Sequence, residues 1–252
     1  MSIIKNNFSK SANNYDKFSF MQDFAGNKLI HMLKGTDPSN IRSILDIGCG
    51  TGTYTIKLKQ MFPNTLVTGI DFSDRMIKAA KLKFKDIDFI VQDGESPKFM
   101  QKFDIITSNA TMQWFNNLEN SISTLSELLT ENGFLVFSIF GPKTYEELNS
   151  SLKTLFNTTE NISAANFKNK EQIFKILNKH FKNVTIDEQL LRTKFKSIKE
   201  LLKRIKYTGT SGHKYVPQKI WTKHTLNKLN LTYLQKNNSL ISTSQIFFIE
   251  AS

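Results

Sequence analysis

The sequence contains a single cysteine, Cys49, among 252 residues, which excludes a framework of intramolecular disulfides. Long apolar runs are also absent. The longest, residues 134–140 and 246–249, are far shorter than the roughly 20 residues of a membrane-spanning helix. The N-terminal segment has neither the apolar core nor the small-residue cleavage site of a signal peptide. We therefore expect a cytoplasmic protein without a membrane partner.

Metal-ligand spacing is missing as well. The four histidines are scattered along the chain and do not recur at the intervals typical of zinc sites; they are His31, His180, His213 and His224. We expect no metal.

The composition is strongly basic, with 34 lysine and arginine residues against 22 acidic ones and a net charge of +12. A charge of this size favours acidic partners, such as nucleic acid, an anionic membrane surface or an acidic protein. The basic residues are mostly lysines scattered among asparagine and isoleucine, without an arginine-rich run. A composition bias explains this equally well, so the charge alone does not identify the partner.

Short apolar segments alternate with segments of helical periodicity. The first thirty-odd residues have helical spacing and end at Gly35-Thr-Asp-Pro38. Ser73 is a predicted N-cap, and Asn132-Gly133 is predicted to end the helix before the fifth strand. Strands are predicted at residues 41–47, 66–70, 87–91, 103–108, 134–140, 184–190 and 244–249, and further helices at 54–62, 76–84, 118–129, 145–156, 172–181 and 198–205.

This alternation predicts βαβ units on a parallel sheet. We expect an α/β fold with a Rossmann-like, mostly parallel sheet of seven strands and helices on both faces. Residues 1–35 are expected to form an N-terminal helical lid and residues 36–252 the main domain. Two segments of that domain, about 141–169 and 192–235, are expected to form a helical cap after the fifth strand, over the carboxyl edge of the sheet.

The most informative motif is DIGCGTG at residues 46–52, which follows a predicted strand and opens a predicted helix. Its glycines let the backbone turn tightly and approach a ligand closely. The dinucleotide fingerprint has its third glycine one position later, where this chain has Thr53. The spacing therefore favours S-adenosylmethionine (SAM) over NAD, with candidate binding residues Asp46, Gly48, Cys49, Gly50, Thr51 and Gly52.

Polar residues follow at the ends of the next strands, where ligands bind in open α/β sheets. Asp71 stands 19 residues after Gly52, where a carboxylate can accept two hydrogen bonds from a ribose diol. Asp93 could accept the adenine amino hydrogen, and Met76 could pack on the adenine ring. The neighbouring candidates are Phe72, Gly94, Glu95, Asn109 and Ala110.

These motifs together resemble the class I SAM-dependent methyltransferases. The stretches that carry the resemblance are DIGCGTG, GIDFSDRM, VQDGE and SNATMQWF, which cover about residues 43–140. The resemblance implies that Asp46 and residues 48–52 line the methionine part of SAM, that Asp71 binds the ribose, and that Asp93 binds the adenine. S-adenosylhomocysteine (SAH) would be the second product.

Four further stretches are similar to the malonyl-acyl-carrier-protein O-methyltransferases of biotin synthesis. They are FSKSANNYD at residues 8–16 with Gln22 after it, SNATMQW at 108–114, FSIFGPKT at 137–144 with Glu147 and Leu148, and IKYTGTS at 205–211. The family commonly has Arg-Ala where this chain has Lys10-Ser11, and lysine loses the bidentate carboxylate binding of arginine. The similarity is weak in the last third of the chain outside residues 206–212.

This resemblance implies methyl transfer from SAM to the free carboxylate of malonyl-acyl-carrier protein or malonyl-CoA. A carboxylate with a pKa of about 4 is ionised at neutral pH, so no general base is needed and a missing His/Asp dyad is expected. An acyl carrier protein is strongly acidic, which would give the positive charge a use in docking.

The resemblance also implies roles for residues outside the cofactor motifs. Tyr15 would be an orienting donor on the lid; the other interpretation is that it packs the first helix. Gln22 would reach the carboxylate of SAM. Gln113 and Trp114 would line the acceptor pocket, and Lys206 and His213 would meet the malonyl carboxylate or the carrier's phosphate, although each of these could also be a packing or solvated residue.

Three other functions stay open. A carboxylate methyltransferase of the trans-aconitate type shares much of the pattern, but the Gln113-Trp114 segment and residues 140–144 argue against it. An RNA methyltransferase would use the positive charge, but no RNA-binding module or N-P-P-Y-type signature is visible, so no nucleic-acid partner is expected. A non-catalytic SAM-binding protein would keep the same glycine loop, and only measured methyl transfer separates it from an enzyme.

Overall fold

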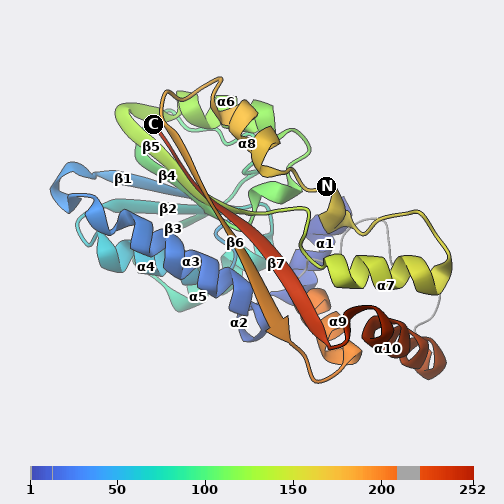
Figure 1. Ribbon diagram of the computed structural model, residues 1–252. Coiled ribbons are helices and arrows are strands. Elements are labelled where there is room, and N and C mark those ends of the chain that lie inside the picture. Colours follow the sequence, from blue (N-terminus) through green and yellow to red (C-terminus); the bar gives the residue numbers. More distant parts are fainter. Residues whose placement is uncertain (1, 13, 209–221) are drawn as a thin grey trace.

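Seven strands pair into one sheet in the order β3-β2-β1-β4-β5-β7-β6 (Figure 1). The computed structural model describes residues 2–12, 14–208 and 222–252. Strands β1 to β5 pair in parallel, and β7 is antiparallel to both β5 and β6. The predicted Rossmann-like sheet is therefore confirmed. The strands are β1 (Ser43–Ile47), β2 (Leu66–Asp71), β3 (Asp88–Val91), β4 (Phe103–Asn109), β5 (Leu129–Phe140), β6 (Val184–Lys194) and β7 (Ile241–Ala251).

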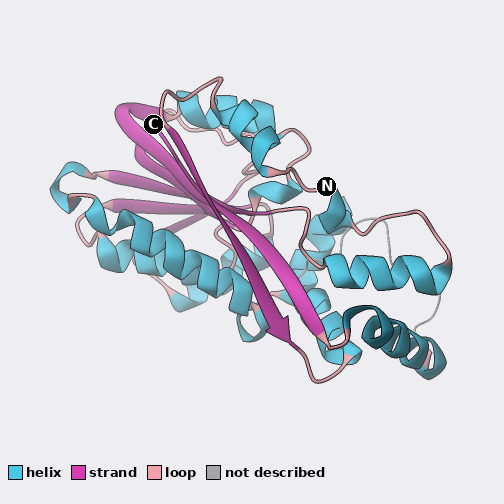
Figure 2. Cartoon of the chain, viewed as in Figure 1, coloured by secondary structure: helices cyan, strands magenta, loops and turns pink. Residues whose placement is uncertain are grey.

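Helices cover both faces of the sheet (Figure 2), because successive residues of its buried strands point to opposite faces. Ile105 belongs to the core formed with α3 (Phe20–Met32) and α4 (Thr53–Met61). Its neighbour Ile106 belongs to the core formed with α6 (Leu118–Glu127) and α8 (Lys170–Leu177). Helix α5 (Asp74–Lys83) packs beside β3, and Ser73 caps it as predicted, by accepting the Met76 N–H at 3.3 Å.

The N-terminal segment forms separate helices where one continuous helix was predicted. They are α1 (Ser2–Ser11), α2 (Tyr15–Phe18) and α3, followed by the 3-10 turn η1 (Leu33–Gly35). Helix α1 reaches the start of α5, where the hydroxyl oxygens of Ser9 and Ser73 lie 2.8 Å apart. The helical periodicity predicted helix formation but not the break, because the direction of α1 depends on contacts with residues far along the chain.

The predicted helix end at Asn132-Gly133 is wrong. Helix α6 ends at Glu127, and β5 has already begun at Leu129, which pairs with Phe103 of β4. The pairing shifts register after this pair, so the irregular start of β5 contains Asn132 and Gly133. A Cβ at Gly133 would lie 2.9 Å from the Phe103 carbonyl oxygen, so this glycine permits a close approach of two strands instead of ending a helix.

Helices α7 (Glu146–Phe156), α9 (Ile198–Tyr207) and α10 (Lys223–Asn237) lie together at one end of the sheet (Figure 1). They share an apolar cluster that includes Leu152, Leu201 and Leu229. The sequence analysis did not distinguish α10 as a separate helix. The division of the chain into lid, domain and cap stays an interpretation, and residues 209–212 of the predicted cap loop lie outside the described residues.

The remaining predicted elements are present with bounds shifted by a few residues. Short 3-10 turns occur at η2 (Pro38–Asn40), η3 (Met112–Trp114) and η4 (Ser163–Asn166). In the part of the chain that the structure describes, no helix has both the length and the apolar character needed to cross a bilayer.

Candidate active site

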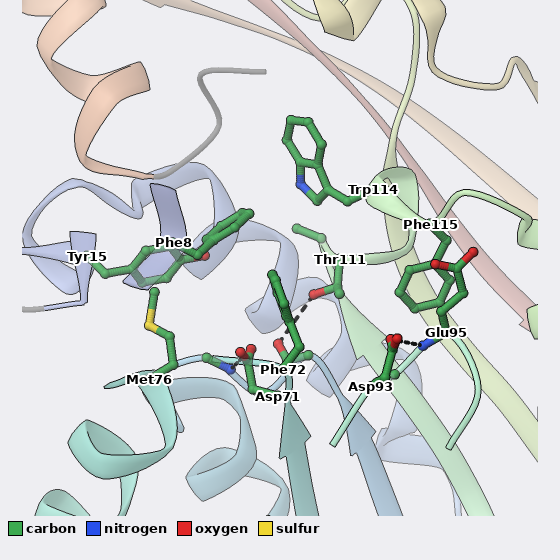
Figure 3. Close-up of a pocket in the computed structure, with 14 residues that line it drawn as sticks. Phe8, Tyr15, Asp71, Phe72, Met76, Asp93, Glu95, Thr111, Trp114 and Phe115 are labelled. Carbon is green, nitrogen blue, oxygen red and sulfur yellow. Dashed lines mark hydrogen bonds between the residues drawn. The ribbon is translucent and has the colours of Figure 1, made fainter. Parts of the chain in front are cut away.

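Two neighbouring cavities lie against the glycine loop, and a third adjoins them. The first cavity, of about 710 Å³, is lined by Asp71, Phe72, Met76, Asp93, Gly94, Glu95 and Ala110, all predicted from strand ends. The second, of about 450 Å³, is lined by Gln22, Asp46, Cys49, Thr51 and Asn109. Tyr15, Gly48 and Gly50 line both, so the structure brings together most of the residues predicted to bind SAM. Figure 3 shows the first cavity between Asp71, Phe8 and Trp114.

Two glycines shape the loop between β1 and α4. Gly48 has φ +71°, and a Cβ there would lie 2.3 Å from the side chain of Thr111. Gly50 has φ +55°, and a Cβ there would meet no atom within 4 Å. Because both residues have a left-handed backbone conformation, a side chain at either position would strain the backbone. The first glycine lets the loop pack on Thr111, and the second presents bare backbone to open space.

Asp71 is held in place by the backbone. Its Oδ1 accepts the Ser73 N–H at 2.8 Å, and its Oδ2 accepts the Gly50 N–H at 3.1 Å. Burial raises the pKa of Asp71 to about 6, although these two hydrogen bonds lower it. Each carboxylate oxygen has a second lone pair, so both can still accept a hydroxyl of a diol.

Asp46 keeps one buried oxygen without a donor. Its Oδ2 accepts the Thr55 hydroxyl at 2.6 Å, whereas Oδ1 has no hydrogen-bond partner among the described residues. Burial raises the pKa of Asp46 to about 7; the Thr55 hydrogen bond opposes this and the charge of Asp71 adds to it. A buried acceptor beside the second cavity fits a cationic donor such as the ammonium group of an amino acid.

The loop after β3 is stabilised by its own carboxylates. Asp93 Oδ1 accepts the Glu95 N–H at 3.0 Å. Glu95 accepts the Asn116 side chain at 3.0 Å and the Asn117 N–H at 2.6 Å, at the start of α6. Glu95 therefore holds two loops together, while no described residue donates to Oδ2 of Asp93.

Asn109 joins the lid to the sheet. Its Nδ2 donates to the Gln22 carbonyl at 2.9 Å, and its Oδ1 accepts the Ser138 hydroxyl at 2.8 Å. Both ends of the side chain are thus used within the protein. Asn109 forms part of the wall of the second cavity and anchors α3, and its predicted contact with SAM stays a prediction.

Cys49 is buried in the glycine loop. Burial raises the pKa of its thiol well above the usual value, and the charges of Asp71 and Asp46 add to this. The thiol is therefore neutral and is suited to packing rather than to nucleophilic attack.

Tyr15 lies at the junction of the first two cavities. Its hydroxyl has no hydrogen bond to any described residue. Burial, and then the charges of Asp71, Asp23 and Asp16, raise the pKa of this phenol. Tyr15 is therefore a neutral donor at physiological pH and not a base, which agrees with the orienting role predicted for it.

Phe8 is a site residue that the sequence analysis quoted only as the start of a motif. Its ring centroid lies 6.3 Å from that of Phe72, 6.2 Å from that of Trp114 and 6.5 Å from that of Tyr15. Figure 3 shows it on the lid side of the first cavity. Only the fold of α1 back onto the sheet edge brings it there.

The third cavity, of about 430 Å³, shares Trp114 with the first cavity and Gln22 with the second. Its walls are largely apolar, and they include Phe18 and Phe167. The Nε1 of Trp114 is buried and has no hydrogen-bond partner among the described residues. This cavity can therefore hold a second ligand beside the first two cavities, with an indole N–H at their boundary.

The other predicted acceptor residues lie elsewhere. Gln113 donates to the Ala110 carbonyl at 2.7 Å and lines none of these cavities, although its buried Oε1 has no partner among the described residues. Lys206 is exposed on α9, with Nζ 5.9 Å from the centroid of the Tyr207 ring. His213 lies outside the described residues. Arg204, which the sequence analysis missed, lines the third cavity instead.

Metal-binding groups are not assembled in the described ranges 2–12, 14–208 and 222–252. No three histidine, cysteine, aspartate or glutamate side chains gather there in a way that could hold an ion. The absence of a metal stays a prediction for the whole protein.

Comparison with known proteins agrees with the fold. Residues 39–230 match the family described as the methyltransferase domain. The fold is similar to that of the YcgJ protein from Bacillus subtilis, with a TM-score of 0.60 at 13% identity over 89% of this chain and 97% of that one. It is also similar to the plantazolicin methyltransferase BpumL, solved with SAH, with a TM-score of 0.53 at 15% identity over 97% and 95%. The chain belongs to the class I SAM-dependent methyltransferases.

Sequence relatives identify the family within this class. Malonyl-(acyl-carrier protein) O-methyltransferase 2 of Ilyobacter polytropus is 33% identical over 233 residues, which is 91% of this chain and 88% of that protein. The enzyme of the same name from Bacillus cereus is 31% identical over 218 residues, or 83% and 81% of the two chains. The chain belongs to the malonyl-(acyl-carrier protein) O-methyltransferase family, and the resemblance inferred from the motifs is confirmed.

Proposed function

We propose that this protein transfers a methyl group from SAM to the free carboxylate of malonyl-acyl-carrier protein, giving the malonyl methyl ester and SAH. The observation that carries the proposal is the junction of the first and third cavities at Trp114, whose buried N–H has no partner among the described residues. By its family, this ester would prime biotin synthesis. The cytoplasmic location, and the absence of nucleic acid, membrane and metal from the reaction, stay predictions.

The first two cavities fit the two halves of SAM. Asp71 offers two acceptors to the ribose, and Asp93 offers one to the adenine, between Phe72 and Met76 in the first cavity. In the second cavity, the unpaired oxygen of Asp46 would accept the ammonium group of the methionine part, and Gln22 would contact its carboxylate. The junction at Tyr15 then lies beside the reacting groups.

Bound SAM supplies a methyl group that is electrophilic because its sulfur is a sulfonium. In the reaction a carboxylate oxygen forms a bond to the methyl carbon, while the carbon–sulfur bond breaks and its electron pair stays on sulfur. The carboxylate is already ionised, so the chain needs no base. Its residues have to align the acceptor oxygen and exclude water. The N–H of Trp114 and the hydroxyl of Tyr15 are neutral donors that can align the oxygen.

Charge supports an acidic carrier as the partner. Helix α9, which contributes Arg204 to the lining of the third cavity, also carries three exposed lysines in a chain of net charge +12. These lysines are Lys199, Lys203 and Lys206. A basic rim attracts an acidic protein over several ångströms and orients it before contact. We assign these lysines to docking of the carrier.

The direct test is methyl transfer from labelled SAM to malonyl-acyl-carrier protein, with malonyl-CoA, trans-aconitate and bulk tRNA in parallel reactions. Ester formation on the malonyl carrier that exceeds transfer to trans-aconitate and tRNA is expected. Transfer to trans-aconitate or tRNA in preference to the carrier would contradict the proposal. If the protein bound SAH but transferred no methyl group to any of these acceptors, it would be a non-catalytic SAM-binding protein.

A further inference from the structure

One cation lines the third cavity. Among the described residues that form this cavity, Arg204 of α9 alone is charged, and most of the others are apolar, including Met21, Phe140 and Phe167. An arginine in an apolar wall is rarely left without an anion, because a desolvated charge needs a partner. The cavity therefore fits a ligand with a negative group.

The surroundings of Arg204 leave it able to bind such a group. Its Cζ lies 5.0 Å from the centroid of the Phe195 ring, so an aromatic face supports the guanidinium. The side chain is half-buried, and no ion pair joins it to a carboxylate in the described part of the chain. Stacking occupies a face of the guanidinium and leaves N–H groups at its edge for a carboxylate.

The lid packs on the helix that carries this arginine. Phe18 of α2 stacks on Tyr207 of α9 with centroids 4.9 Å apart, and both Phe18 and Arg204 line the third cavity. Thr208 donates its hydroxyl to the Arg204 carbonyl at 3.0 Å, at the end of α9. Lys206, two residues further, is exposed and lines none of the three cavities.

We propose that Arg204 binds the acceptor carboxylate and so selects malonyl over acyl groups that end in a methyl group; this rests on the proposed function. The guanidinium holds one carboxylate oxygen, which leaves the other to receive the methyl group. The ester product is neutral and loses this charge pairing, so Arg204 binds the substrate more tightly than the product. Arg204 is thus a specificity residue that also favours product release.

The experiment measures the affinities of malonyl-acyl-carrier protein and acetyl-acyl-carrier protein for the enzyme saturated with SAH, which cannot react. The two ligands share the carrier and the phosphate of its prosthetic group, and they differ in the free carboxylate, which only the malonyl group has. Their affinity ratio therefore reports only the group that Arg204 is proposed to bind. Arg204→Gln, Arg204→Lys and the matched control Lys206→Gln are compared with the wild type.

We expect the malonyl preference of the wild type to fall about 30-fold or more in Arg204→Gln, because the charged partner of the malonyl carboxylate is removed. Arg204→Lys should keep part of it, since lysine retains the charge but not the planar fork. Lys206→Gln should weaken both ligands alike and leave the ratio unchanged.

An unchanged affinity ratio in an Arg204→Gln protein that still binds SAH would overturn the proposal. If both affinities fell equally, the ratio would also be unchanged, and Arg204 would then bind the carrier phosphate instead of the malonyl carboxylate. If Arg204→Gln does not bind SAH, Arg204→Lys decides, and a wild-type ratio there overturns the proposal. Failure of the proposed function is separate: the wild type would then not methylate malonyl thioesters at all.

Discussion

The hydroxyl of Thr51 donates a hydrogen bond to Oδ1 of Asp16, so the glycine loop is joined directly to the helix that covers it. Lys83 of α5 forms an ion pair with the other oxygen of the same carboxylate. Asp16 thus connects α2 to the glycine loop and to α5, across the two cavities assigned to SAM. These contacts hold α2 beside the two cavities.

Asp16→Ala should weaken SAH binding by about tenfold, because the lid loses a charge-assisted hydrogen bond and a partly exposed ion pair. Isothermal calorimetry would measure the affinity. The dissociation rate should rise more than the association rate falls, since the contact forms after entry. Asp86→Ala is the matched control, because Asp86 is an exposed acid and its loss changes the net charge equally. Equal affinities for the two variants would show that the lid is not held closed by Asp16.

Tyr15→Phe should lower kcat by about tenfold while leaving SAH affinity nearly unchanged, because the ring is kept and a single neutral donor is lost. The pKa of Tyr15 is raised by burial and by neighbouring carboxylates, so the phenol does not ionise near neutral pH. The kcat of the wild type, measured at saturating SAM, should therefore stay flat from about pH 7 to about pH 9. A rate that rises through this range in the wild type, and not in Tyr15→Phe, would make Tyr15 a base instead.

Asp46 and Asp71 should make the stability of the cofactor-free protein fall between about pH 4 and about pH 7. Burial raises their pKa values to about 7 and about 6, above the unfolded value of about 4. In this window the folded state binds more protons than the unfolded state, so the free energy of unfolding decreases as pH rises. Thermal unfolding across this range would measure it.

SAM should bind better as pH rises towards about 7, because its ammonium group requires ionised Asp46. The shift of the melting temperature on adding SAM should be larger at about pH 8 than at about pH 5.5. Asp46→Asn removes one of the two titrating groups, so it should flatten the pH dependence of the SAM-induced shift and make the pH dependence of stability shallower, with Asp71 still contributing. If the SAM-induced shift of the wild-type melting temperature did not depend on pH, Asp46 would not be the partner of the ammonium group.

Reversing the charges of Lys199, Lys203 and Lys206 should raise the KM for malonyl-acyl-carrier protein and make it less sensitive to salt. The KM for malonyl-CoA and the affinity for SAH should change little, because neither needs the protein surface of the carrier. The matched control reverses Lys34, Lys85 and Lys102, which are exposed and precede the parallel strands β1, β3 and β4 at the opposite edge of the sheet. If both triple variants raised this KM equally, the effect would come from the net charge of the protein and not from docking at α9.

Much of the cofactor site was predictable because each of its residues follows a local pattern. Asp46 and Asp71 lie at the carboxyl ends of β1 and β2, and Asp93 lies two residues after β3; parallel strands bring these ends to one edge. The Ser73 cap likewise depends on neighbours within three residues. In contrast, the end of α6 was misplaced, because Asn132-Gly133 resembles a helix stop and only the pairing of Leu129 with Phe103 shows that a strand has begun.

The acceptor side depends on contacts that no local pattern contains. Arg204 and Lys206 are both cations of one lysine-rich helix, and their sequence context does not distinguish them. The rotation of α9, set by burial of Leu201 against α7 and α10, places Arg204 in the cavity and Lys206 in solvent. Phe8 likewise reaches the site only because α1 folds back onto α5. The sheet, the glycine loop and the family could be inferred from residue order alone, because they depend on short-range periodicity and motif spacing. Which side chains meet around the acceptor depends on the packing of helices that lie far apart along the chain, and no local pattern contains that information.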